Sequence, residues 1–160
     1  MSISVIDYGS GNLKSAAKAL ELAANNINAR SKITVTSDPK IIKQSEKIVL
    51  PGQGSFRDCY LGIKKIPGLD ETLNEFVLEK KKPILGICVG MQLFAKTGYE
   101  SQETKGFGWI DAEVRKINNM NKKLKLPHMG WNEIELKKIV FFFLILKINL
   151  TFILFIVMNL

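Results

Sequence analysis

Hydrophobic and polar positions along residues 1–96 alternate between strand patterns and the spacing of an amphipathic helix. The predicted strands are residues 3–7, 32–37, 46–52 and 83–87. The predicted helices are residues 13–25 behind Asn12 as N-cap, residues 38–44 with Pro39 near the first position, residues 70–82 and residues 91–96. Strands that alternate with helices indicate an α/β fold, with an open, mostly parallel sheet and helices on both faces.

The pattern changes after Gly106. Residues 111–136 read as antiparallel strands joined by tight turns, which we expect to form a flap on the sheet. Residues 139–160 are a hydrophobic run in which Lys147 is the only charge. The composition therefore predicts a domain over residues 1–138 and a separate hydrophobic tail over residues 139–160.

Charge and cysteine content narrow the function classes. The net charge is +8, but the lysines fall at helix ends and hairpin edges without interleaved aromatic residues, so we expect no nucleic-acid partner. The two cysteines are too few for a disulfide framework and lack metal-ligand spacing, so we expect neither a metal nor a cofactor. The N-terminal residues do not resemble a secretory signal, and a cytoplasmic location is predicted.

Cys88 is the main candidate for chemistry. It lies between Gly86 and Gly90, directly after an apolar strand and before a predicted helix, in the pattern of a nucleophile elbow. Such a turn exposes the nucleophile at the carboxyl edge of the sheet, where open α/β sheets bind ligands. The N-terminus of the following helix favours a thiolate and a developing oxyanion. The other cysteine, Cys59, is expected to be a buried apolar side chain.

A second glycine-rich segment follows another buried strand. In LPGQGSF, Gly52 and Gly54 flank Gln53, which lets the backbone approach a ligand closely at the same edge of the sheet. The residues alone are equally compatible with an ordinary glycine turn.

Five segments together resemble the class I (triad) glutamine amidotransferases and, more narrowly, the glutaminase subunits of imidazole glycerol phosphate synthases. They are DYGSGN, LPGQGSF, GICVGMQLF, KGFGWI and LPHMGWNEI, in family order across residues 1–138. The resemblance implies a flavodoxin-like sheet and a Cys88 that attacks the side-chain amide of L-glutamine, giving ammonia and a glutamyl thioester. It also implies an oxyanion hole at Gly52, Gln53 and Val89, and substrate contact by Gln92.

The resemblance further implies a partner. In this family ammonia passes to a (β/α)8-barrel cyclase subunit that acts in histidine biosynthesis, and the two subunits form a heterodimer. The residues implied to face that subunit are Tyr8, Gly9, Asn12, Pro127, His128, Trp131 and Asn132. For His128, Met129 and Trp131, a purely structural role in a turn or core is equally compatible with the sequence.

A cysteine nucleophile needs a base and an orienting carboxylate. In the family these come from a His-Pro-Glu motif that this sequence lacks, and His128, the only histidine, belongs to a different motif. We therefore expect impaired glutamine hydrolysis by this chain.

Three explanations of residues 139–160 are open. As a membrane span, the run would bear a cost of about 2.5 to 3.5 kcal/mol for Lys147. As core, it lacks the alternation of a half-buried strand. As a reading-frame shift near Lys137 and Lys138, an alternative frame can encode Phe-Val-His-Ser-Tyr, which resembles a family strand. A membrane location is not favoured.

Two alternative functions fit the sequence less well. One is a class I glutaminase of the pyridoxal phosphate synthase type, against which YGSGN and PHMGWN argue. The other is a non-catalytic, tail-anchored protein on the same fold, which carbonate extraction of membranes would distinguish.

Overall fold

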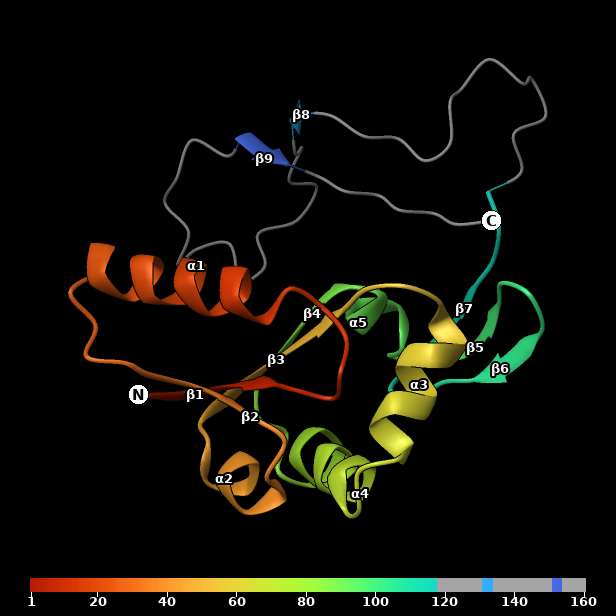
Figure 1. Cartoon of the computed structure of the whole chain (residues 1–160), viewed down its shortest axis with the longest axis horizontal. Coiled ribbons are helices and arrows are strands. Elements are labelled where there is room, and N and C mark those ends of the chain that lie inside the picture. Colours follow the sequence, from red (N-terminus) through yellow and green to blue (C-terminus); the bar gives the residue numbers. More distant parts are fainter. Residues whose placement is uncertain (118–130, 134–150, 154–160) are drawn as a thin grey trace. The chain divides into compact units, whose positions relative to one another are not determined.

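The computed structural model describes residues 1–117, 131–133 and 151–153 (Figure 1). Contacts within the chain separate residues 1–116 from residues 117–159, and each unit is described by itself. The division predicted at residue 138 stays a prediction.

The first unit is built on a four-stranded parallel sheet in the order β2-β1-β3-β4. Its strands are β1 (Ser2–Ile6), β2 (Lys32–Thr36), β3 (Lys47–Gly52) and β4 (Ile84–Cys88). All three pairings are parallel, so every strand ends at the same edge of the sheet. This order is that of the flavodoxin-like doubly wound sheets, and the predicted α/β class is confirmed.

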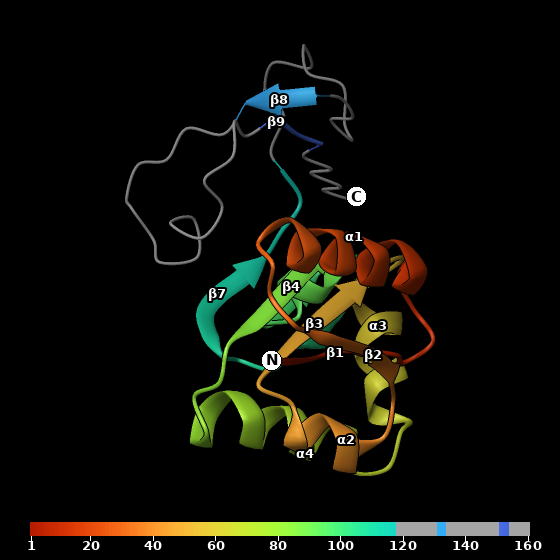
Figure 2. The same cartoon turned by 90° about the vertical axis from the view of Figure 1, so that its left-hand side faces the viewer.

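Helices cover both faces of this sheet, as Figure 2 shows. Alternate strand residues point to opposite faces. Val5 and Val49 pack with the apolar side of α1 (Leu13–Asn26), whereas Ile6, Ile48 and Leu50 belong to the larger core on the other face. That larger core also takes residues from α2 (Pro39–Gln44), α3 (Phe56–Lys64) and α4 (Leu69–Asn74), namely Ile42, Ile63 and Leu73.

Two predicted helix starts are confirmed by their caps. The side chain of Asn12 accepts the N–H of Ser15, and that of Asp38 accepts the N–H of Lys40 with Pro39 in the first turn. An N-cap oxygen satisfies a backbone donor that the helix itself leaves unpaired. The boundaries at these two helices therefore follow from local chemistry.

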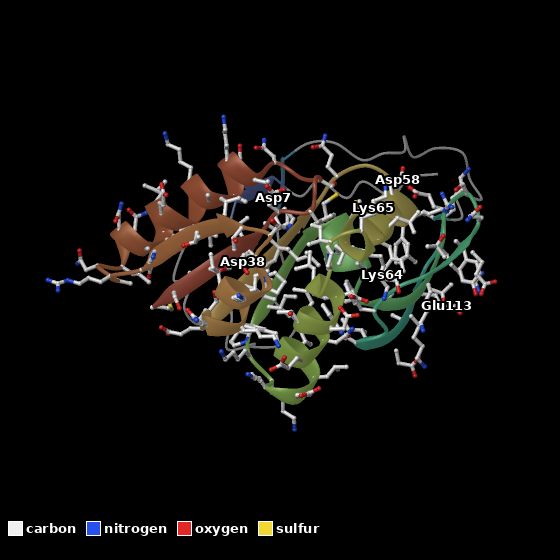
Figure 3. All side chains as sticks on the ribbon, turned by 60° about the horizontal axis from the view of Figure 1, so that its bottom comes forward. Asp7, Asp38, Asp58, Lys64, Lys65 and Glu113 are labelled. Atoms are coloured by element: carbon white, nitrogen blue, oxygen red, sulfur yellow. The ribbon has the colours of Figure 1, made fainter. Side chains whose placement is uncertain are left out.

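Helix α3 was not predicted. Ser55 accepts the N–H of Asp58 at 3.0 Å and donates to its carboxylate at 2.7 Å, which is a variant of the capping box. Asp58 lies in the first turn and Lys64 in the last turn, charges that suit the helix dipole (Figure 3). The Ser-x-x-Asp spacing is the signal that could have found this helix.

The helix predicted over residues 70–82 is divided and ends earlier. It comprises α4 and a π-helical turn, η1 (Glu75–Glu79). At the junction, the amide oxygen of Asn74 accepts the indole N–H of Trp109, and the Glu75 carboxylate pairs with two lysines. The contacts from Trp109 and Lys43 come from distant parts of the sequence and leave no trace in the helical periodicity, which explains why the sequence predicted one continuous helix.

The segment after β4 differs from the prediction. The helix predicted over residues 91–96 is wrong in extent, since α5 (Val89–Gln92) is a single turn and residues 95–99 form β5 (Ala95–Tyr99). In a second sheet, β5 pairs antiparallel with β6 (Glu103–Lys105) but parallel with β7 (Ile110–Val114). The parallel partner β5 precedes the predicted flap, and the antiparallel pairing predicted within residues 111–136 stays a prediction, because most of those residues lie outside the described part of the chain.

Phe56 joins the second sheet to the core. Its buried ring lies where a β-carbon on Gly98 would stand 2.6 Å from Cγ, so only glycine fits there. The carboxylate of Glu100 accepts the Phe56 N–H at 2.8 Å, across 44 residues of sequence. The indole of Trp109 stacks on Phe107 with ring centroids 4.3 Å apart. These contacts position the chain that follows Cys88.

In the second unit, β8 (Trp131–Glu133) pairs antiparallel with β9 (Thr151–Ile153). β9 lies inside the hydrophobic run, where the pattern predicted no strand. Pro127 and His128 lie outside the described residues, as does most of residues 139–160. Within the described part of the chain, no helix has the length and apolar character needed to cross a bilayer.

The ion pairs of Glu75 generate a prediction about pH. Its carboxylate lies 2.7 Å from Lys43 Nζ and 2.9 Å from Lys80 Nζ. The hydrogen bond from Lys43, followed by the hydrogen bond from Lys80, lowers the pKa of Glu75 from 4.5 to about 2. A depressed folded-state pKa stabilises the fold above the unfolded-state value. The contribution is therefore present above pH 4.5 and is lost as the pH falls toward 2.

We expect the free energy of unfolding, measured by urea titration at a series of pH values, to depend less on pH below 4.5 in Glu75→Gln than in the wild type. Glu21→Gln, on the exposed side of α1, is the matched control and should keep the wild-type slope. Parallel curves for the wild type and Glu75→Gln would contradict the assignment.

Candidate functional site

The two glycine-rich segments meet at the carboxyl edge of the main sheet. β3 and β4 pair in parallel with Gly52 opposite Cys88, so the end of one strand lies beside the end of the other. The sequence predicted both segments at this edge, and the register brings them into contact. The cysteine and the glycine loop therefore form one site.

Cys88 carries a strained backbone. Its φ is 55° and its ψ is −121°, a backbone conformation that residues with a β-carbon rarely adopt. Cys88 is the last residue of β4 and directly precedes α5. The thiol is half-buried, whereas Cys59 is buried as predicted. Strain of this kind is found where a fold holds a side chain in a functional position.

The flanking glycines serve close packing rather than backbone freedom. Positive φ belongs to Cys88 itself and not to Gly86 or Gly90. A β-carbon on Gly90 would collide with the carbonyl oxygen of Leu50 and lie 2.8 Å from its carbon, and one on Gly86 would lie 2.7 Å from Met91 N. The elbow therefore packs against the backbone of β3, and this closeness requires the glycines.

Gly52 lies against the peptide that follows the cysteine. A β-carbon on Gly52 would collide with the backbone nitrogen of Gly90 and lie 2.9 Å from the carbonyl carbon of Val89. Val89 is itself buried. The structure thus brings together Gly52, Val89 and Cys88, three of the residues for which the sequence predicted a common role.

Gln53 is held by the loop between β1 and α1. Its N–H donates to Ser10 Oγ at 3.0 Å, and Ser10 Oγ donates to the Gln53 carbonyl oxygen at 2.6 Å. The Cys59 thiol also approaches that carbonyl, at 3.4 Å. The N–H of Gln53 would have to leave Ser10 to reach an oxyanion.

The residues predicted to face a partner differ in position. Tyr8 is 5% exposed and belongs to the core. Gly9, with φ of 83°, has open space where a β-carbon would stand, and Asn12 caps α1. Trp131 and Asn132 lie on β8 in the second unit, and their roles stay predictions.

Three residues near the site were missed or given another role by the sequence analysis. Ser10 binds the glycine loop, Tyr8 supports it, and Glu100 binds the start of α3. A serine between two glycines carries no distinctive signal, and contacts over more than 40 residues have no periodicity. Gln92, the substrate-contact candidate, is the last residue of α5. Among the described residues, no cluster of His, Cys, Asp or Glu could hold a metal ion.

Comparison with known proteins gives consistent matches. Residues 4–140 match the family model of class-I glutamine amidotransferases. Imidazole glycerol phosphate synthase subunit HisH of Pelagibacter ubique is 53% identical over 139 residues, which are 86% of this chain and 65% of that protein. The protein of the same name from Bradyrhizobium diazoefficiens is 50% identical over 135 residues, 84% of this chain and 62% of that protein.

The chain therefore spans 62 to 65% of the length of these curated relatives. Among solved structures, one titled as a crystal structure of glutamine amidotransferase superimposes with a TM-score of 0.58 at 14% identity. That match covers 81% of this chain and 62% of the other, and it supports the fold.

The backbone of Cys88 generates a prediction about stability. Alanine keeps the β-carbon that makes a φ of 55° costly, whereas glycine does not. We expect Cys88→Gly to be more stable than Cys88→Ala by about 1 kcal/mol in urea denaturation. At Ile84, on the same strand without positive φ, the order should reverse, with glycine less stable by about 0.5 to 1 kcal/mol. If the glycine variant were the less stable one at position 88 as well as at position 84, the backbone of Cys88 would not be strained.

Proposed function

Because the chain belongs to the class-I glutamine amidotransferase family, we propose that it is the glutaminase subunit of an imidazole glycerol phosphate synthase, with Cys88 as nucleophile. The observation that carries the proposal is the pairing of Gly52 with a strained Cys88, which puts a glycine backbone beside a half-buried thiol at the carboxyl edge of the sheet. The names of the relatives favour this synthase over the pyridoxal phosphate type of glutaminase.

The chemistry follows from these positions. The Cys88 thiolate attacks the side-chain amide carbon of glutamine, so that a C–S bond forms and the amide oxygen becomes an oxyanion. The proposed donors that stabilise that charge are backbone N–H groups at Gly52, Gln53 and Val89. Collapse breaks the C–N bond, and the departing nitrogen takes a proton and leaves as ammonia. Water then cleaves the thioester, which releases glutamate and restores the thiol.

A general base is also needed to move these protons. The only histidine of the sequence, His128, lies outside the described residues, so the described part of the chain contains no imidazole. The described part of the chain therefore contains the proposed nucleophile and the backbone around it. An experiment on Cys88 should therefore use a reaction that needs the thiol and its backbone but no general base.

The proposed partner is a cyclase subunit that receives the ammonia in a heterodimer. The support is the shared name of the relatives, which are subunits of a synthase. Gly9 and Asn12, at the carboxyl edge of β1, are the described residues with which we propose that this chain faces the partner, together with Trp131 and Asn132 of β8. For Pro127 and His128, which lie outside the described residues, contact with the partner is proposed from the resemblance alone. We place this assembly in the cytoplasm.

The proposal is tested with a diazo-ketone analogue of glutamine. Thiol addition forms a C–S bond, expels N2 and transfers the thiol proton to the carbon, without a water step. We expect mass spectrometry to find one adduct, on Cys88, and L-glutamine to slow the labelling by the factor 1 + [Gln]/Kd.

Cys88→Ser should abolish the adduct, and Cys59→Ala should retain it, because Cys59 is 1% exposed. Asparagine, one methylene shorter, is the ligand control and should protect poorly. Labelling that L-glutamine does not slow, or an adduct on Cys59, would refute the proposed function.

A further inference from the structure

β4 is an edge strand of the main sheet. It pairs with β3 on one side, and no other strand of the described residues pairs with it on the other side. Flavodoxin-like sheets have five strands in the order 2-1-3-4-5. The strands of this sheet occupy the first four places of that order, so the place of a fifth strand is the free edge of β4.

The register shows which backbone groups face this free edge. The N–H of Ile48 on β3 donates to the carbonyl oxygen of Pro83, the residue before β4, at 3.2 Å. Successive residues of a strand direct their backbone groups to opposite sides, so Pro83 and every second residue after it bond to β3. The N–H and C=O groups of Ile84 and Gly86 therefore point away from β3, and no described backbone group pairs with them.

The side chains of β4 are also incompletely covered. Its uncharged sequence, ILGIC, is typical of a parallel strand that is buried on both faces. Ile84 and Leu85 are only half-buried, however, and Ile87 is 40% exposed. Their neighbours on β3, Val49 and Leu50, are buried. β4 has neither a lysine nor a bulge, features by which proteins protect a free strand edge, so its edge is suited to accept another strand.

The length of the relatives indicates where such a strand is encoded. About a third of the Pelagibacter ubique protein lies outside its match with this chain. A parallel strand needs a crossover connection of a dozen or more residues, and a third of that protein is long enough for the connection and the strand. All pairings within the main sheet are parallel, so a parallel neighbour continues its pattern.

We propose that the free edge of β4 is an interaction surface for a fifth, parallel strand, and that this strand belongs to the part of the relatives that lies outside the match. The added strand bonds to the outward N–H and C=O groups of Ile84 and Gly86, and its apolar side chains cover Leu85 and Ile87. Backbone hydrogen bonds give such strand addition its affinity, and side-chain contacts give its specificity. The proposal concerns binding and is independent of the chemistry at Cys88.

The test adds the unmatched part of the Pelagibacter ubique protein, produced as a separate polypeptide, to the full chain. Amide exchange of the isotope-labelled chain is followed by NMR, and the Kd is measured by calorimetry. Before the addition, exchange should be fast at Ile84 and Gly86 and slow at Leu85 and Ile87, whose N–H groups bond to β3. We expect exchange at Ile84 and Gly86 to slow about tenfold when the polypeptide is present at ten times its Kd. A polypeptide of the same composition in scrambled order is the control.

Ile87→Lys replaces an apolar contact with a charge and should weaken binding at least about tenfold. Val35→Lys is the matched control, since Val35 is 42% exposed on β2, the other edge strand of the sheet, and its Kd should equal that of the wild type. The exchange measurement on the wild type carries the test if Ile87→Lys does not fold.

Failure to bind, equal binding of the scrambled polypeptide, binding without slower exchange at Ile84 and Gly86, or equal weakening by both lysine variants would overturn the proposal. Slow exchange at these two amides in the chain alone would also overturn it, because the edge would then already be covered. None of these outcomes bears on the proposed function, which depends on the protection of Cys88 by L-glutamine. Labelling of Cys88 that L-glutamine does not slow would refute that function and leave the surface on β4 standing.

Discussion

The site depends on one constraint: the backbones of β3 and of the turn after β4 approach more closely than side chains allow. Gly90 lies on the carbonyl of Leu50, and Gly52 lies on the nitrogen of Gly90. The parallel register puts Gly52 opposite Cys88. The positive φ of the turn belongs to Cys88 and not to the glycines on either side of it. The packing at this edge therefore involves the same residues that carry the strained backbone and the half-buried thiol.

Three strand ends contribute to this edge, and each contributes a different kind of group. β4 supplies the thiol, β3 supplies backbone peptides, and the loop after β1 supplies the hydroxyls that orient those peptides. Tyr8 holds the peptide before Gly52, while Ser10 holds both sides of Gln53. Each of these contacts joins residues that are more than 40 positions apart in the sequence.

Local patterns in the sequence determined most of the main sheet. The alternation in β2 identifies a strand because successive side chains point to opposite faces. The continuous apolar runs of β3 and β4 are typical of parallel strands covered on both faces. Asn12 and Asp38 identify helix starts because a cap satisfies backbone donors within three residues. The same local logic found Cys88 and the glycine loop, since a strand followed by glycines predicts a turn at the carboxyl edge. The capping residues Ser55 and Asp58 carried an equivalent signal for α3.

Contacts between distant residues decided the rest, because such contacts impose no period on the chain. The bond from Trp109 to Asn74 and the pairing of Glu75 with Lys43 accompany a π-helical turn where the pattern predicted a continuous helix. Phe56 and Glu100 position the second sheet, whose mixed pairing the sequence did not predict. Tyr8 illustrates the limit best. Its motif is local, but its burial and its hydrogen bond to Pro51 exist only because β1 and β3 are neighbours in the sheet.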